Sequence, residues 1–139
     1  MTWFAWALLS AFFAALTALL AKVGVAAIDP NLASAIRTLV IVIFTWIVAF
    51  WTRPAAGWYA FSGKAWLFLV LSGLGTGLSW LCYFHALQVG PASRVASVDK
   101  LSVVMVILFA ALFLREELSW GKVLGGALIL VGGVIIAVE

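Results

Sequence analysis

The sequence predicts an all-α integral membrane protein with five transmembrane helices in a single domain, residues 1–139. The first observation is composition, because 67% of the residues are hydrophobic and only 9% are charged. A soluble domain of this size could not bury so much apolar side chain. The second is length, because the apolar residues fall into five runs that can span a membrane. The third is pattern: the runs lack the alternation of barrel strands, and a helix pairs its backbone groups within one segment.

The five helices are expected over about residues 2–21, 32–51, 66–88, 92–114 and 120–138. Residues that break helices separate them at Asp29-Pro30-Asn31, Arg53-Pro54 and Gly90-Pro91. Aromatic residues near the predicted helix ends are typical of the membrane interface, namely Trp3, Trp6, Trp51, Trp58, Tyr59, Trp66 and Trp120.

The fourth helix contains the first candidate functional residues. Its uninterrupted apolar run, Leu101–Leu114, is about 21 Å long, short of the roughly 30 Å hydrocarbon core. The helix must therefore extend backward through Ala92–Lys100, and Pro91 suits its start. If Leu114 marks one membrane boundary, Asp99 and Lys100 lie about 6 to 8 Å below the other.

Counting residues in the other helices places five ionisable side chains in one depth band near one membrane face. We interpret them as candidates for a substrate path or gate: Lys22, Arg37, His85, Asp99 and Lys100. Buried ionisable residues in membranes usually pair or face water. An Asp99–Arg37 pair is favoured, with Asp99–Lys22 second, and the pair acts either as a gate or as a structural link between helices.

Two simpler interpretations stay open for this cluster. Lys22 and Arg37 are long enough to snorkel to the lipid headgroups. A single histidine such as His85 is more often interfacial or packed than a proton relay. No ligand-spaced cluster supports a metal site, and we expect no metal and no cofactor.

The third and fifth helices have polar and small faces. A polar stripe on the third lines a cavity or makes interhelical hydrogen bonds, and its members are Ser72, Thr76, Ser79 and Tyr83. Small residues that allow close helix packing are Gly73 and Gly77 on the third helix, and Gly121, Gly125 and Gly132 on the fifth, with Gly126 and Gly133 beside them. Cys82 is expected as a small buried side chain.

Composition and motifs also exclude some functions. The net charge of +3 comes from scattered residues, which argues against nucleic-acid binding. Paired acids, a nucleophile with a base, and metal-ligand spacing do not occur, so an enzyme is not expected. Membrane lipid and a small-molecule substrate are the expected partners. A transporter and a non-transporting membrane subunit both stay open at this point.

Nearly the whole chain resembles one family. PASRVASVDKLSVVMVILFAALFLREELSWGKVLGGALILVGG is similar to the end of EamA-type domains of the drug/metabolite transporter superfamily, with REELS at Arg115–Ser119 where GE-L-S is usual. AKVGVAAIDPNLASAIRTLV resembles the first two helices, including an embedded Arg37, and SGLGTGLSWLCYFHALQVG resembles the third. DKLS at Asp99–Ser102 resembles the short, single-domain bacterial and archaeal branch. His85 departs from the longer basic residue expected there.

The resemblance implies a secondary transporter of small metabolites in a prokaryotic inner membrane. Larger relatives have ten helices in two inverted repeats, with substrate near the repeat interface. A five-helix chain corresponds to one repeat, so the resemblance implies a homodimer of two oppositely inserted copies. The loop charges differ only modestly between the faces, with Arg53, Lys64, Arg115 and Lys122 on one and Lys22 and Arg94 on the other, which is compatible with dual topology.

Overall fold

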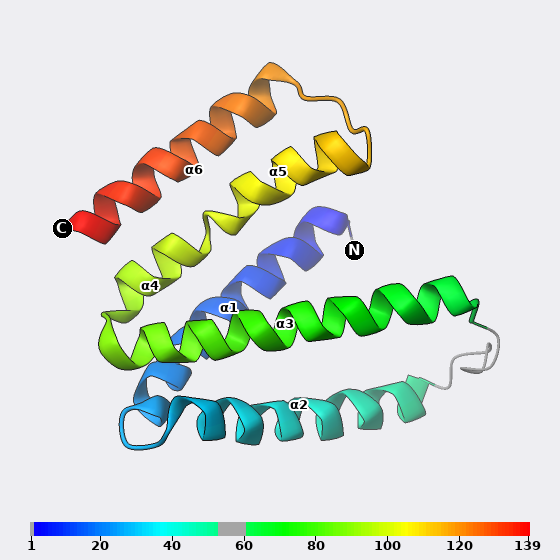
Figure 1. Cartoon of the computed structure of the whole chain (residues 1–139), viewed down its shortest axis with the longest axis vertical. Coiled ribbons are helices and arrows are strands. Elements are labelled where there is room, and N and C mark those ends of the chain that lie inside the picture. The colour runs from blue at the N-terminus through cyan, green and yellow to red at the C-terminus, as the bar shows by residue number, and fades with distance from the viewer. Residues whose placement is uncertain (1, 53–60) are drawn as a thin grey trace. The chain divides into compact units, whose positions relative to one another are not determined.

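The computed structural model describes residues 2–52 and 61–139. The expectations for Arg53, Pro54, Trp58 and Tyr59 concern residues outside these ranges. The described residues form six helices and no strand: α1 (Trp3–Val25), α2 (Pro30–Thr52), α3 (Gly63–Val89), α4 (Ala92–Asp99), α5 (Ser102–Phe113) and α6 (Trp120–Val138). Figure 1 labels these helices along the chain.

Five segments are long and apolar enough to cross a membrane, with α4 and α5 together forming the fourth, Ala92–Phe113. The predicted fold class is therefore confirmed. Most large apolar side chains are exposed, and the buried apolar residues of the described ranges are Ala18, Val25, Phe84 and Leu87. Such a surface is stable only when lipid surrounds it, because water would have to solvate it otherwise.

Local capping explains where several helices begin. α2 starts at Pro30, two residues before the predicted start, because proline suits the first helical position. The Oδ1 of Asp29 accepts hydrogen bonds from the N–H groups of Asn31 and Leu32, both at 3.0 Å. The hydroxyl of Ser119 likewise accepts from the Lys122 N–H at 3.3 Å, and α6 has the predicted bounds.

The fourth span differs from the expectation of one helix over residues 92–114. It is two helices, with the break at Lys100 and Leu101. Tight three-residue hydrogen bonds replace the α-helical ones there, from the Leu101 N–H to the Val98 carbonyl and from the Val103 N–H to the Lys100 carbonyl, both 3.0 Å. The apolar pattern continues through this point, and residues 92–113 still form one span of the expected length; periodicity does not reveal the tight turn within it.

The chain divides into two compact units. The first contains residues 1–22 and 89–139, and in it α6 packs against both α4 and α5. Two glycines of α6 make this approach possible. A β-carbon on Gly133 would lie 3.1 Å from Leu101 Cδ2 and 3.2 Å from the Ser97 carbonyl oxygen, and one on Gly126 would lie 3.5 Å from Ile107 Cδ1.

The second unit contains residues 23–88, and therefore the end of α1, all of α2 and nearly all of α3. Its buried side chains include Val25, Ser34, Phe84 and Leu87. The Gln88 side-chain amide donates to the Ile28 carbonyl at 3.4 Å, which ties the end of α3 to the turn before α2.

Candidate functional site

The broken fourth span places an acid–base pair at a helix end inside a predicted membrane span. Asp99 is the last residue of α4, and its carboxylate lies 3.4 Å from the Lys100 ammonium. The side chains are 39% and 59% exposed, respectively. The backbone here stays in the right-handed helical region, at φ −68° and ψ −11° for Lys100 and φ −62° and ψ −19° for Leu101, and its N–H groups remain hydrogen-bonded. The role of the ion pair toward a substrate stays a prediction.

Lys22 lies in the same unit, at the end of α1. Its ammonium donates a hydrogen bond to the Gly90 carbonyl at 2.9 Å. Gly90 belongs to the connection between α3 and α4, so this bond anchors the start of the broken span to α1. Asp99 pairs with its chain neighbour Lys100, while the predicted Asp99–Arg37 pair joins residues of different units and stays a prediction.

Arg37 has an aromatic environment. The Cζ atom of its guanidinium lies 4.2 Å from the ring centroid of Trp80 and 5.5 Å from that of Phe84. Both distances are within the range of cation–π attraction. Trp80 and Phe84 are four residues apart and so share one face of α3. The sequence analysis considered only charged partners for Arg37. It missed the two aromatic residues, although the four-residue spacing of Trp80 and Phe84 is visible in the sequence.

The other candidate residues of α3 differ in their surroundings. His85 is exposed, and its Nδ1 lies 3.3 Å from the Leu81 carbonyl of the preceding turn. Thr76 donates its hydroxyl hydrogen to the Ser72 carbonyl at 2.9 Å within the same helix. Ser72, Thr76 and Ser79 are exposed and Tyr83 is half-buried. Their role as a cavity wall stays a prediction. Cys82 is exposed, so the expectation of a buried thiol was wrong.

The glycines divide into those that make close contacts and those that face open space. Gly126 and Gly133 face α5 and the break region, as described above. A β-carbon on Gly125 or Gly132 would meet no atom within 4 Å, and one on Gly121 would meet only its own helix cap, the Ser119 hydroxyl at 3.9 Å. Gly73 and Gly77 of α3 are also open. The open face of α6 stays a predicted contact between subunits.

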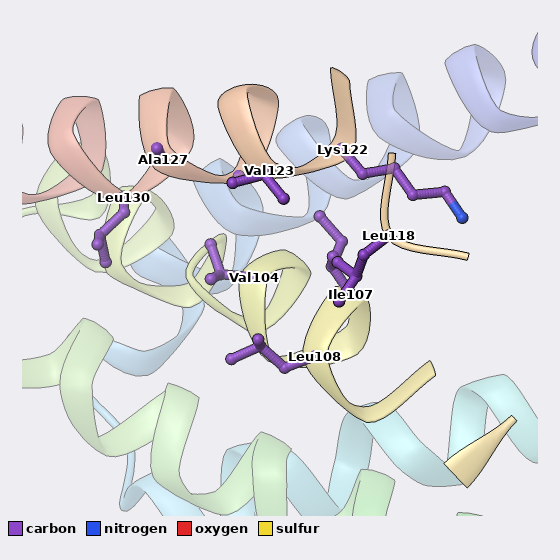
Figure 2. Close-up of a pocket in the computed structure, with 9 residues that line it drawn as sticks. Val104, Ile107, Leu108, Leu118, Lys122, Val123, Ala127 and Leu130 are labelled. Carbon is purple, nitrogen blue, oxygen red and sulfur yellow. The ribbon is translucent and has the colours of Figure 1, made fainter. Parts of the chain in front are cut away.

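An apolar pocket of about 230 Å³ lies between α5 and α6 (Figure 2). Aliphatic side chains line it, including Val104, Ile107 and Leu130. Lys122 is its charged lining residue, and Figure 2 shows the lysine side chain extending away from the aliphatic ones. Its ammonium lies 3.3 Å from the Glu116 carboxylate and 3.0 Å from the Glu117 carbonyl. This pocket offers a polar substrate no hydrogen-bonding groups beyond that paired lysine.

Metal chemistry finds no support in this arrangement. Among residues 2–52 and 61–139, no group of three or more His, Cys, Asp or Glu side chains is placed to hold a metal ion. The candidate functional groups are therefore the Asp99–Lys100 pair at the helix break and the Arg37 guanidinium on its aromatic support.

Comparison with known proteins places the whole chain in one group. The sequence model described as the EamA-like transporter family matches residues 1–138. A protein from Sinorhizobium sp., described as an uncharacterized transporter in the cobO 3′ region, is 52% identical over 141 residues. That alignment covers 99% of this chain and 97% of the relative. No solved structure matches the chain.

Proposed function

This chain belongs to the EamA-like transporter family, and on that premise we propose that it is a secondary transporter of small metabolites that acts as a homodimer. It is a multi-pass membrane protein, and its family consists of transporters rather than enzymes. We place it in the inner membrane of a prokaryotic cell. The observation that supports the proposal is the Asp99–Lys100 ion pair at a short 3₁₀ turn within the fourth span. Transporters bind substrates and ions at interrupted helices near the membrane midplane.

Length supports a position for the break inside the membrane. With Leu114 at one membrane boundary, Asp99 and Lys100 lie about 6 to 8 Å below the other. Asp99 has a short side chain and cannot reach the headgroups from that depth. A carboxylate there is supported by Lys100 in the resting state and is available to a substrate or a proton during transport.

Oligomerisation follows from the number of spans. Five helices enclose little space, and an odd number places the two termini on opposite membrane sides. Two copies inserted in opposite directions would recreate the inverted repeats that alternating access uses. Each copy would then present its polar groups toward a different membrane face.

A flux assay in liposomes tests the transport proposal. Metabolites that raise the melting temperature of the purified protein would be offered as labelled substrates to proteoliposomes. We expect flux of at least one of them, and Asp99→Asn should reduce it at least tenfold. Glu116→Gln is the matched control, because it removes a carboxylate from the other lysine ion pair, at 3.3 Å. Full flux in Asp99→Asn would remove the proposed role of this residue, and absence of flux for every hit would favour a non-transporting subunit.

Dual topology has its own test. Reporters fused to either terminus should show both orientations in one cell population. Arg94→Gln removes a positive charge from one set of loops, so it should increase the fraction with the other set in the cytoplasm. A single orientation in all cells would reject the antiparallel dimer.

A further inference from the structure

Arg37 is held in a specific position within the second unit. Its guanidinium is closer to the Trp80 ring, at 4.2 Å, than to the Phe84 ring, at 5.5 Å. Phe84 is only 3% exposed, so this end of the aromatic face is firmly packed. A guanidinium stacked on such rings loses little rotational freedom when it forms further hydrogen bonds.

The direction of the side chain argues against snorkelling. Arg37 lies seven residues into α2, about 10 Å from the start of that helix. Trp80 lies nine residues before the end of α3, about 13 Å from that end, and Phe84 is closer to the end. Both helix ends adjoin the same side of the membrane in a five-span chain. The guanidinium therefore contacts the deeper of the two rings, whereas a snorkelling side chain would extend the other way.

The second unit supplies no carboxylate for this guanidinium. Asp29 is the only acidic residue between positions 23 and 88 in the sequence. Its Oδ1 accepts two backbone hydrogen bonds at the start of α2, both 3.0 Å. Aromatic rings attract the charge of the guanidinium through their faces, but they do not accept the N–H groups along its edge. The rings thus support the charge of Arg37, the Tyr83 phenol interacts with it electrostatically, and the unit contains no carboxylate other than that of Asp29.

We propose that Arg37, stacked on Trp80, binds the oxyanion group of the transported substrate, so that the substrates are small carboxylates or phosphates. A guanidinium recognises planar oxyanions through two parallel hydrogen bonds, and a low-dielectric environment strengthens that contact. This inference rests on the proposed transport function and specifies its substrate class. A lipid phosphate has the same chemistry, and the experiment below separates the two sources.

Binding is measured by the melting temperature of the full-length protein in a detergent with an uncharged headgroup. Sodium succinate and sodium phosphate are compared with sodium chloride at equal ionic strength. We expect at least one oxyanion to raise the melting temperature of the wild type. Arg37→Gln should abolish the shift. Arg37→Lys should weaken binding at least tenfold, because an ammonium lacks the planar fork.

The aromatic support is tested separately. Trp80→Leu should weaken oxyanion binding, and Trp80→Phe should retain most of it because the ring face persists. Lys64→Gln and Trp66→Leu are matched controls, because they remove a base and an indole from the exposed start of α3, and both should bind like the wild type. Size-exclusion profiles confirm that each variant is folded. An Arg37→Gln protein that responds to the oxyanions like the wild type would overturn the proposal.

A lipid headgroup is distinguished from a soluble oxyanion as the ligand by repeating the melting-temperature measurements in nanodiscs. Discs of phosphatidylcholine alone are compared with discs that also contain phosphatidylglycerol. If phosphatidylglycerol stabilises the protein in an Arg37-dependent way while no soluble oxyanion does, the ligand is a headgroup and the substrate assignment is wrong. Arg37-dependent binding without flux in the liposome assay would reject the transport function and retain the oxyanion site. Flux together with Arg37-independent binding would support the transport function and reject the oxyanion site.

Discussion

The close packing of α6 against the broken span predicts different effects for two adjacent glycines. Gly133→Ala would place a methyl group 3.1 Å from Leu101 Cδ2 and 3.2 Å from the Ser97 carbonyl oxygen. The leucine methyl can rotate away, but the carbonyl belongs to the backbone of α4, so the two helices must separate slightly. Overpacking of this kind costs about 1 to 3 kcal/mol. Gly132→Ala meets no atom within 4 Å and carries no such cost.

Both substitutions share a second effect, which is favourable. Alanine is better than glycine in a helix interior by about 0.5 to 1 kcal/mol. Gly132→Ala should therefore be neutral to stabilising, and Gly133→Ala should be destabilised relative to it by about 1 to 3 kcal/mol. For a chain of this length the two melting temperatures should differ by about 3 to 10 °C.

The assay is thermal unfolding of the purified proteins, followed by tryptophan fluorescence in a detergent that keeps them monomeric. Leu101→Ala in the Gly133→Ala background identifies the contact responsible. Recovery of stability would assign the clash to the leucine, and no recovery would assign it to the Ser97 carbonyl. Equal melting temperatures for Gly132→Ala and Gly133→Ala would refute the reasoning, because they would mean that α6 does not approach the break closely.

Two further predictions concern the end of α5 and the open face of α6. Arg115 has a φ of 56°, a left-handed conformation that costs a residue with a β-carbon about 1 kcal/mol. Arg115→Gly should therefore raise the melting temperature by a few degrees, whereas Arg115→Ala should not, and equal effects of the two would contradict the role of this strain. On the proposal that α6 forms the subunit contact, Gly125→Leu and Gly132→Leu should decrease dimer cross-linking in membranes without lowering the melting temperature of the monomer, since both positions face open space. Undiminished cross-linking would mean that this face of α6 is not the subunit interface.

The comparison of prediction and structure is clearest at the helix ends. Asp29-Pro30 and Gly90-Pro91 interrupt the helices where expected, because proline restricts its neighbour and glycine tolerates the turn. α6 begins directly after Ser119, whose hydroxyl caps it. α1 runs on to Val25, four residues past the predicted Ala21, because no residue there prevents continuation and apolarity alone does not mark an end.

The candidate site was only partly predictable. The ionisable residues inside the spans were found because charge is rare and costly in such segments. The acidic partner expected for Arg37 stays a prediction, and within its own unit the structure adds the ring of Trp80. Spacing on one helix reveals which side chains share a face, but it does not reveal which face of another helix they meet.

Composition, run length and helix-breaking residues indicated by themselves a chain with five membrane-spanning segments, because burial in lipid and local backbone preferences depend on the chain alone. Only the tertiary structure decided where the fourth span breaks and what supports Arg37. Contacts between helices accompany both features, with Gly133 close to Leu101 and the guanidinium close to Trp80, and residues 30 or more positions apart meet only when the helices pack.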